Sequence, residues 1–335
     1  MNAKALVATA SDSFHYADVV LPEPGPDQLL VQTLVSGVSA GTEFAVIQKK
    51  IDWGPYPMCT GYQGVGVVQF AGPRVEGFAA GDKVYYRANR NICLPDGQKV
   101  SALAGVHCSA AVIDPAGTHG AAIVPEGIDE EAASLFVMPA VGLNGVDMAN
   151  PHMGDLVAVH GCGLVGLAVV AASSLRGCRV VAIDLDENRL AVAARLGADH
   201  LIHGARQDPV EALGRLDEKG AQVVFECTGV PACIDQAIRL CRLQGKFVLQ
   251  GHYGRQPVSY NFLEPHSRRL RMYYPYDDGY APSRRAVLKQ MALGALPWHE
   301  TITHRIDSRE AAAFYQATGQ GKVKDLIGAV VRWAP

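Results

Sequence analysis

The sequence feature that most constrains the fold is an apolar run that ends in three closely spaced glycines. Residues 155–170 read DLVAVHGCGLVGLAVV, with Gly161, Gly163 and Gly166 in the spacing G-x-G-x-x-G. The apolar residues before Gly161 predict a buried strand, and those after Gly163 predict a helix. A strand, a glycine-rich turn and a helix in this order are typical of the phosphate-binding start of a doubly wound α/β domain.

Each glycine of this motif has its own predicted role. Gly161 permits the tight turn, and Gly163 lets a pyrophosphate group approach the backbone. Gly166 allows the helix to pack closely on the strand. The free N–H groups at the start of the helix, at Leu164 and Val165, then face the phosphates. The alternative is a cluster of packing glycines in a domain that binds no nucleotide.

Strands and helices alternate regularly around this motif. The predicted strands are fully apolar and the predicted helices are amphipathic, which indicates a parallel sheet covered on both faces. We predict strands at residues 155–160, 179–185, 200–203, 221–227, 245–252 and 268–275, and helices at 129–149, 163–177, 187–198 and 231–244.

An acidic residue follows the motif at the distance expected of a dinucleotide site. The second predicted strand of this region contains Asp184, 23 residues after Gly161, where a carboxylate accepts hydrogen bonds from the adenosine ribose. A 2′-phosphate a few ångströms from this carboxylate would cost about 4 kcal/mol at an effective dielectric constant of about 20. Arg189 is the nearest arginine, and we expect it to contact solvent or a carboxylate. The sequence therefore predicts NAD rather than NADP.

The first part of the chain, residues 1–137, is rich in predicted strands. Its short apolar segments are separated by Gly and Pro, and the predicted strands are residues 4–10, 28–39, 64–72, 82–88 and 110–116. The C-terminal part predicts helices at 283–296 and 308–319 and a last strand at 328–333. A chain of 335 residues is long enough for two domains.

Composition and charge exclude several classes of function. Hydrophobic residues make up 49% of the chain, which supports full-sized cores, and the net charge is −3. Nothing in this charge attracts nucleic acid or an anionic membrane. The apolar runs are too short to span a bilayer, and the N-terminus lacks the apolar core of a secretion signal. We expect a cytoplasmic protein with no nucleic-acid or membrane partner.

The eight cysteines do not form a metal-binding pattern. None belongs to a C-x-x-C pair, and most fall inside apolar runs. This distribution favours buried free thiols in a reducing compartment. A zinc site built from cysteines is therefore not expected.

Taken together, these segments resemble the medium-chain dehydrogenase/reductase superfamily along essentially the whole chain. The resemblance rests on VSGVSAGTEF, TGYQGVGVV, RVEGFAAGDKV, VPEGIDEEAASL, HGCGLVG, ARLGADHLI, VVFECTGVP and ITHRIDS. It implies an α/β protein with a GroES-like, strand-rich catalytic domain, residues 1–137 and 278–335. A Rossmann NAD-binding domain with a doubly wound parallel sheet, residues 138–277, is inserted between the two parts.

The resemblance also implies further cofactor contacts and an oligomer. It places Cys227, Thr228 and Gly229 at the carboxyl edge of the sheet near the nicotinamide ribose, together with Gly251. Homodimers or homotetramers are usual in this superfamily, often through the last strand of the cofactor domain, which here is predicted at residues 268–275.

The positions that hold zinc in metal-dependent members of the superfamily carry other residues here. This chain has AGTE at residues 40–43 where those members have Cys-Gly-Thr-Asp, and GYQ at 61–63 where they have Gly-His-Glu. The third ligand position falls near Val137. Zinc in such a site needs three ligands from Cys, His and carboxylate, whereas Ala40 and Tyr62 are not ordinary zinc ligands. We therefore expect no metal.

Three residues are candidates for the chemistry that zinc performs in related enzymes. Thr42 matches the hydroxyl that relays the proton, although it could instead cap the following helix. Glu43 could act as a base with a pKa raised by burial, or form a structural ion pair at the domain interface. Tyr62 could hydrogen-bond the reacting oxygen, or fill the volume of the missing histidine. His107 lies in an apolar segment, where a buried core residue is the expected role.

Among zinc-lacking members, the chain looks most like the bacteriochlorophyllide a dehydrogenase-like group, which oxidises a secondary alcohol with NAD. This resemblance predicts a zinc-independent alcohol dehydrogenase acting on a small-molecule alcohol or ketone. One alternative is a quinone or enone reductase of the same superfamily, a group that usually prefers NADPH. Another is a non-catalytic protein that keeps NAD as a sensor or structural ligand.

Overall fold

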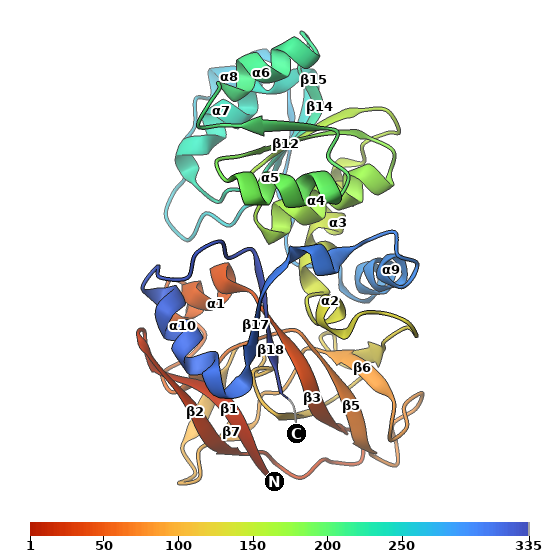
Figure 1. Ribbon diagram of the computed structural model, residues 1–335, viewed down its shortest axis with the longest axis vertical. Helices are drawn as coiled ribbons and strands as arrows, with labels where there is room; N and C mark the ends of the chain where they lie inside the picture. Colours follow the sequence, from red (N-terminus) through yellow and green to blue (C-terminus); the bar gives the residue numbers. More distant parts are fainter. Residues whose placement is uncertain (334–335) are drawn as a thin grey trace. The chain divides into compact units, whose positions relative to one another are not determined.

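The computed structural model describes residues 1–333, and their contacts divide the chain into two units. The first unit contains Met1–Phe136 and the segment that starts at Ile302, and the second contains Val137–Thr301 (Figure 1). Residues 278–301, which we expected in the first unit, group with the second. They do so because helix α9 (Tyr280–Ala292) packs against α3 (Val137–Ala149).

The strands described for the second unit form one parallel sheet. From edge to edge, its order is β13 (His200–His203), β12 (Arg179–Asp184), β11 (Leu156–His160), β14 (Ala221–Glu226), β15 (Cys241–Leu249) and β16 (Arg271–Tyr273). Numbered in chain order within the unit, this is 3-2-1-4-5-6, the Rossmann order. The order reverses between β11 and β14, and ligands of such sheets bind at the carboxyl ends of the strands beside this point.

Helices cover both faces of this sheet. Figure 1 shows α4 (Leu164–Leu175) and α5 (Glu187–Arg195) on one side, and α6 (Pro209–Leu216), α7 (Ile234–Arg239) and α8 (Leu263–Ser267) on the other. Short helical turns are η1 (Pro231–Cys233) and η2 (Trp298–Thr301). Asp186 and Asp208 accept hydrogen bonds from the first N–H groups of α5 and α6, which explains where these helices begin.

One helix of the second unit is shorter than its sequence pattern predicts. We expected a helix at residues 231–244, but α7 ends at Arg239 and β15 begins at Cys241. Cys241 is fully buried and pairs with Ala221 of β14. Its backbone groups therefore join the sheet, and this tertiary pairing overrides the local helical pattern.

The strands described for the first unit form a closed barrel and a seven-stranded sheet. The barrel order is β1 (Asn2–Ala10), β2 (Ser13–Val20), β7 (Ile92–Cys93), β8 (Lys99–Ala102) and β4 (Met58–Cys59). The sheet order is β10 (Ala121–Ile123), β6 (Lys83–Tyr86), β5 (Gly64–Ala71), β3 (Leu29–Val38), β18 (Gly328–Arg332) and β17 (Ile302–Asp307), with β9 (Ala110–Ile113) also paired to β3. Figure 1 shows the blue C-terminal strands beside β3. The expected α/β class, a strand-rich domain plus a doubly wound parallel sheet, is confirmed.

Helices of the first unit include α1 (Ala40–Ile47), α2 (Glu130–Ser134), η3 (Ser308–Glu310) and α10 (Ala311–Gly319). The single helix predicted at 129–149 is divided into α2 and α3. Between them Phe136 is fully buried, with its ring centroid 4.4 Å from that of Tyr85. The division also places Pro139 in the first turn of α3, where its missing N–H leaves no helical hydrogen bond unmade.

Candidate active site

The glycine-rich turn lies between β11 and α4, as predicted. Gly161 has a φ of +95°, a conformation that residues with a side chain rarely adopt. A Cβ on Gly166 would lie 1.8 Å from the carbonyl oxygen of Gly161, so the helix packs too closely on the turn for any larger residue. A Cβ on Gly163 would meet no atom within 4 Å. The space beside Gly163 is therefore open to a ligand.

The start of α4 provides hydrogen-bond donors beside this open space. Gly163 is the N-cap residue, and the first turn of α4 contains no acidic side chain. Leu164 and Val165 are half-buried, and the first N–H groups of a helix have no partner within the helix. A helix start of this kind suits an anionic group such as a pyrophosphate.

Asp184 lies beside the glycine-rich turn at the end of β12. Its Oδ2 accepts a 2.6 Å hydrogen bond from the N–H of Cys162, and its Oδ1 accepts a 3.0 Å bond from the N–H of Asp186. These two bonds hold the partly exposed carboxylate at the carboxyl edge of the sheet. Arg189 Nε lies 4.0 Å from Asp186 Oδ2, so the contact with a carboxylate expected for Arg189 is present but long.

The family resemblance predicts that four residues contact the nicotinamide ribose, and these lie together just after β14 and β15. They are Cys227, Thr228, Gly229 and Gly251. Cys227 donates its N–H to the carbonyl of His160 at 2.8 Å. A Cβ on Gly161 would lie 2.8 Å from Cγ2 of Thr228, and a Cβ on Gly251 would lie 2.5 Å from the nitrogen of Gly229. The segment after β14 that contains Thr228 is therefore in contact with the glycine-rich turn at Gly161.

Sequence reasoning missed Glu226, the last residue of β14. Glu226 is fully buried and accepts hydrogen bonds from the N–H of Thr228, at 3.0 Å, and from the hydroxyls of Thr228 and Tyr253. Burial alone would raise the pKa of Glu226, but interactions with His160, Thr228 and Tyr253 lower it instead. An acid at the end of an apolar strand was a signal that could have identified it.

The second unit thus offers what a bound dinucleotide needs. It has open space beside Gly163, a helix start for phosphates, and a carboxylate at Asp184 placed to accept ribose hydrogen bonds. These residues fit a nicotinamide dinucleotide.

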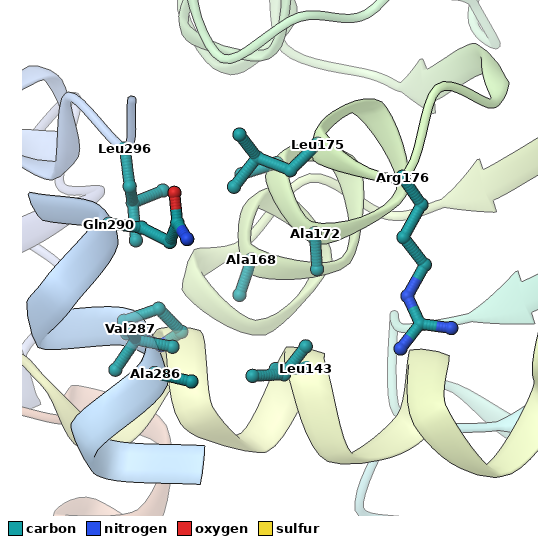
Figure 2. A pocket seen from close by; sticks show the side chains of 11 residues that line it. Leu143, Ala168, Ala172, Leu175, Arg176, Ala286, Val287, Gln290 and Leu296 are labelled. Atoms are coloured by element: carbon teal, nitrogen blue, oxygen red, sulfur yellow. The ribbon is translucent and has the colours of Figure 1, made fainter. Parts of the chain in front are cut away.

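A separate pocket of about 190 Å³ lies among α3, α4 and α9 of the same unit (Figure 2). Its walls are mainly apolar and include Leu143, Ala168, Leu175 and Val287. Arg176 at its edge forms an ion pair with Asp147. None of the predicted site residues lines this pocket.

In the first unit, Thr42 and Tyr62 lie side by side. Thr42 is exposed in the first turn of α1, whereas Tyr62 is only 6% exposed. Burial raises the pKa of Tyr62 to about 12, although hydrogen bonds with the side chains of Ser39 and Thr42 oppose this rise. The phenol therefore keeps its proton at neutral pH. The N-cap residue of α1 is Ser39, so Thr42 does not occupy the capping position that we considered for it.

The guanidinium of Arg87 covers the ring of Tyr62. The Cζ atom of Arg87 lies 5.3 Å from the centroid of the Tyr62 ring, and Nε of Arg87 donates a 3.0 Å hydrogen bond to the Tyr62 carbonyl. This cation–π contact and the backbone bond fix the orientation of Tyr62.

Glu43 lies in the core of the first unit. Its side chain is fully buried and accepts hydrogen bonds from the N–H of Ser39 at 2.8 Å, from His107 at 3.0 Å and from the hydroxyl of Tyr315 at 2.7 Å. Burial alone would raise the pKa of Glu43, but the charge and hydrogen bond of His107, with the other donors, lower it. The raised pKa that we expected for a base is therefore not found.

His107 is a fully hydrogen-bonded core residue, as expected of a histidine in an apolar segment. Its Nδ1 lies 2.7 Å from the Ser36 hydroxyl, and its Nε2 contacts Glu43 and Tyr315. The indole N–H of Trp333 donates to the same Ser36 oxygen at 2.7 Å. Ser36, Tyr315 and Trp333 were not predicted, because no local sequence pattern relates them to Glu43.

Two protein-family models match this chain. The alcohol dehydrogenase GroES-like domain matches residues 25–126, and the zinc-binding dehydrogenase family matches residues 165–278. The order of these two domains along the chain supports the resemblance to the medium-chain dehydrogenase/reductase superfamily.

Relatives of this chain include an alcohol dehydrogenase from Cupriavidus necator, which is 25% identical over 286 residues. The match covers 75% of this chain and 76% of that protein. A sorbitol dehydrogenase from Halalkalibacterium halodurans is 27% identical over 279 residues, covering 77% of this chain and 80% of its own. A Sinorhizobium meliloti 1021 protein solved with NADP shares the fold, with a TM-score of 0.86, 24% identity and 99% of each chain covered. These relatives support an oxidoreductase of the same superfamily. No helix within residues 1–333 has the length and apolar character needed to cross a membrane.

The positions that carry zinc ligands in metal-dependent members of this superfamily do not fit the metal here. Ala40, the first residue of α1, and Val137, the first residue of α3, have no donor atom. Tyr62, with a pKa of about 12, stays protonated at neutral pH. A tetrahedral zinc site needs three good ligands, and these residues do not supply them.

Proposed function

We propose that the chain is a zinc-independent oxidoreductase that uses NAD to transfer hydride between a secondary alcohol or ketone and nicotinamide. Two features together carry the proposal. The turn at residues 161–166 leaves open space beside the start of α4, and Ala40 and Tyr62 stand at the predicted zinc-ligand positions. The resemblance to the bacteriochlorophyllide a dehydrogenase-like group favours a secondary alcohol. The relatives named above, an alcohol dehydrogenase and a sorbitol dehydrogenase, support a substrate with a hydroxyl group.

Thr42 and Tyr62 would handle the proton of the reaction. The bound dinucleotide supplies the hydride donor or acceptor. During ketone reduction, the protonated phenol of Tyr62 can hydrogen-bond the substrate oxygen as negative charge develops on it. The exposed Thr42 hydroxyl, hydrogen-bonded to Tyr62, then relays the proton, and the reverse path serves alcohol oxidation.

Glu43 would act as a positioning residue in this scheme. Its carboxylate accepts the N–H of Ser39 at the start of α1, and its other oxygen is held by His107 and Tyr315. Thr42 lies in the first turn of α1. The hydrogen bonds of Glu43 therefore hold this turn in place and position the Thr42 hydroxyl. Catalysis by Glu43 itself, which we considered from sequence, is not part of the proposal because its side chain is fully buried.

The preference for NAD is proposed from Asp184. A 2′-phosphate beside this carboxylate would be repelled by about 4 kcal/mol at an effective dielectric constant of about 20, and the nearby Arg189 already faces Asp186. The Sinorhizobium meliloti protein of the same fold, which is 24% identical to this chain, was solved with NADP. In this chain, Asp184 supports the choice of NAD instead.

Calorimetry with NAD and NADP, followed by a turnover screen, tests the proposal. We expect NAD to bind more tightly, and protein treated with a chelator to turn over secondary alcohols or ketones without added metal. Turnover that appears only after zinc is added would contradict zinc independence. Activity only on quinones or enones with NADPH would identify a reductase, and tight NAD binding without turnover on any substrate would identify a binding protein.

We also propose a homodimer or homotetramer formed through the edge strand β16. This strand pairs with β15 on one side only in the described chain, and a second copy could continue the sheet. Light scattering of the purified protein, with Met272→Pro in β16 as the disrupting variant, tests this arrangement. A wild-type chain that is monomeric at micromolar concentration would contradict it.

A further inference from the structure

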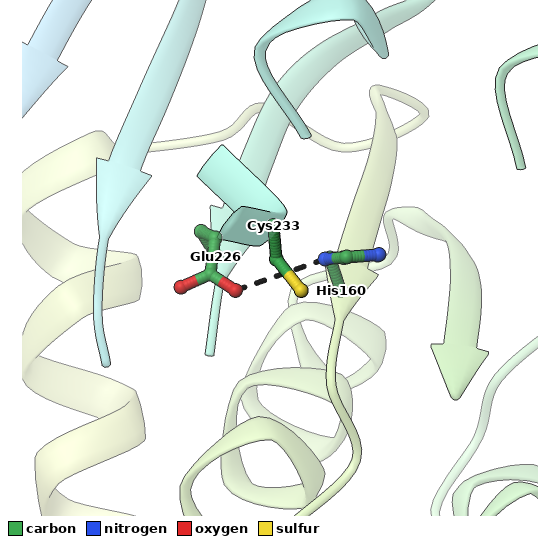
Figure 3. A group of neighbouring side chains, drawn as sticks. All are labelled: His160, Glu226 and Cys233. Atoms are coloured by element: carbon green, nitrogen blue, oxygen red, sulfur yellow. Dashed lines mark ion pairs between the residues drawn. The ribbon is translucent and has the colours of Figure 1, made fainter. Parts of the chain in front are cut away.

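Three side chains with the chemistry of metal ligands meet at the carboxyl end of the parallel sheet. His160 ends β11, Glu226 ends β14, and Cys233 ends the turn η1 that follows β14. One ligand atom from each residue lies within 4.8 Å of the other two. Figure 3 shows the sulfur of Cys233, the imidazole of His160 and the carboxylate of Glu226 grouped together.

His160 gives an independent sign that this cluster takes a ligand. The residue is only 7% exposed, and its Nδ1 has no hydrogen-bond partner among the described residues. Nδ1 and Glu226 Oε1 lie 3.7 Å apart, an ion-pair contact that is longer than a hydrogen bond. A buried polar atom without a partner loses solvation with no compensation. Figure 3 shows this nitrogen facing the other two groups, where a shared ligand would satisfy it.

We propose that His160, Glu226 and Cys233 bind a thiophilic divalent cation, for which Zn²⁺ is the best match. An imidazole, a thiolate and a carboxylate are the ligand types of zinc, and three protein ligands leave a fourth position open. Mg²⁺ and Ca²⁺ prefer oxygen ligands alone. Zinc bonds of about 2.0–2.3 Å at tetrahedral angles place ligand atoms roughly 3.3–3.8 Å apart. The distance of 3.7 Å between His160 Nδ1 and Glu226 Oε1 falls in this range.

The surroundings of the cluster support metal binding. The Thr228 N–H, at 3.0 Å, and the Tyr253 hydroxyl hydrogen-bond the Glu226 carboxylate and so orient it; such outer contacts commonly position metal ligands. Cys233 is partly exposed, whereas Glu226 is fully buried. The thiol side therefore provides the route by which an ion enters. The site is unrelated to the zinc positions of the superfamily, and the proton path proposed above does not use it.

Cobalt spectroscopy of the full-length protein tests this inference. Chelator-treated wild-type protein is titrated with Co²⁺, which gives a thiolate-to-cobalt charge-transfer absorption when a cysteine ligates it, and then with Zn²⁺ against a chromophoric chelator. The variants are Cys233→Ser and His160→Gln. Cys93→Ser is the control, because Cys93 is a partly exposed free cysteine outside the cluster.

We expect one metal ion per chain and a charge-transfer band in the wild type and in Cys93→Ser. Cys233→Ser should abolish the band, and either ligand variant should weaken Zn²⁺ binding by at least about 10-fold. If His160→Gln fails to fold, Cys233→Ser decides alone, because Cys233 is partly exposed. A folded wild type without the band, or a band that persists in Cys233→Ser, would overturn the inference.

Discussion

Tyr315 donates a 2.7 Å hydrogen bond to Glu43 across 272 positions of the chain. Both side chains are fully buried, and the bond joins α10 to α1 in the core of the first unit. The exposed Thr42 lies on α1, next to the buried acid. A bond between two residues that a substrate cannot reach thus positions the hydroxyl proposed to take part in the reaction.

Replacement of Tyr315 by phenylalanine should destabilise the protein. The variant removes one donor from a buried carboxylate, and hydrogen bonds to charged groups contribute about 1.5–3 kcal/mol. Urea unfolding measures the loss, with Tyr276→Phe as the control because Tyr276 is 88% exposed. Equal stabilities of Tyr315→Phe and the control would show that the network contributes nothing to folding.

The contribution of Glu43 should depend on pH in a defined direction. Its pKa in the folded protein is lowered from the ordinary value of 4.5, so its stabilisation is fully present above that value and is lost as pH falls through the lower folded value. The difference in unfolding free energy between the wild type and Glu43→Gln should therefore shrink on acidification from about pH 6 to about pH 3. A difference that stays constant or grows would contradict the lowered pKa.

Thr42→Ala should lower kcat without changing NAD affinity. Loss of a positioned proton-transfer group typically slows a reaction about 100-fold or more, while the residues that fit NAD lie in the second unit. Steady-state kinetics and calorimetry separate these effects. Thr9→Ala is the matched control, since Thr9 is an exposed threonine of the same unit. Full kcat in Thr42→Ala would remove Thr42 from the mechanism.

Two glycines of the cofactor motif should respond differently to alanine. A Cβ on Gly166 would lie 1.8 Å from a backbone oxygen, so Gly166→Ala should cost at least about 1–3 kcal/mol of stability. A Cβ on Gly163 meets no atom within 4 Å, but Ala is a poorer N-cap than Gly, so Gly163→Ala should cost no more than about 1 kcal/mol of stability yet weaken NAD binding. Thermal unfolding and calorimetry measure both. Unchanged NAD affinity in Gly163→Ala would mean that the phosphates bind elsewhere.

Asp184→Asn should raise affinity for NADP relative to NAD. The amide oxygen can still accept a backbone hydrogen bond, but the charge that repels a 2′-phosphate is gone, and we expect the affinity ratio to shift at least about 10-fold. Asp199→Asn is the control, because Asp199 accepts the N–H of Val180 near the opposite end of β12. An unchanged ratio would show that another group selects the cofactor.

Most of the cofactor unit could be predicted from sequence because its signals are local. The buried strand β11, the turn at Gly161 and the helix α4 follow each other directly, and the spacing to Asp184 depends on one helix and one strand. The prediction of a single helix at residues 231–244 was wrong because the signal that ends this helix is not local. Cys241 joins β14 through a partner 20 positions earlier, Ala221, and a helical pattern does not contain that pairing.

The sequence by itself thus determined the doubly wound sheet and the glycine-rich turn at residues 161–166, and it placed Ala40 and Tyr62 at the predicted zinc-ligand positions. Each of these is a matter of residue type and short spacing. Only the tertiary structure decided that Glu43 is buried against His107 and Tyr315. It alone also brought His160, Glu226 and Cys233 together. The burial of Glu43 and the meeting of these three side chains depend on contacts between segments that are far apart in the sequence. Such contacts form only when the chain folds and strands from its separate parts pair.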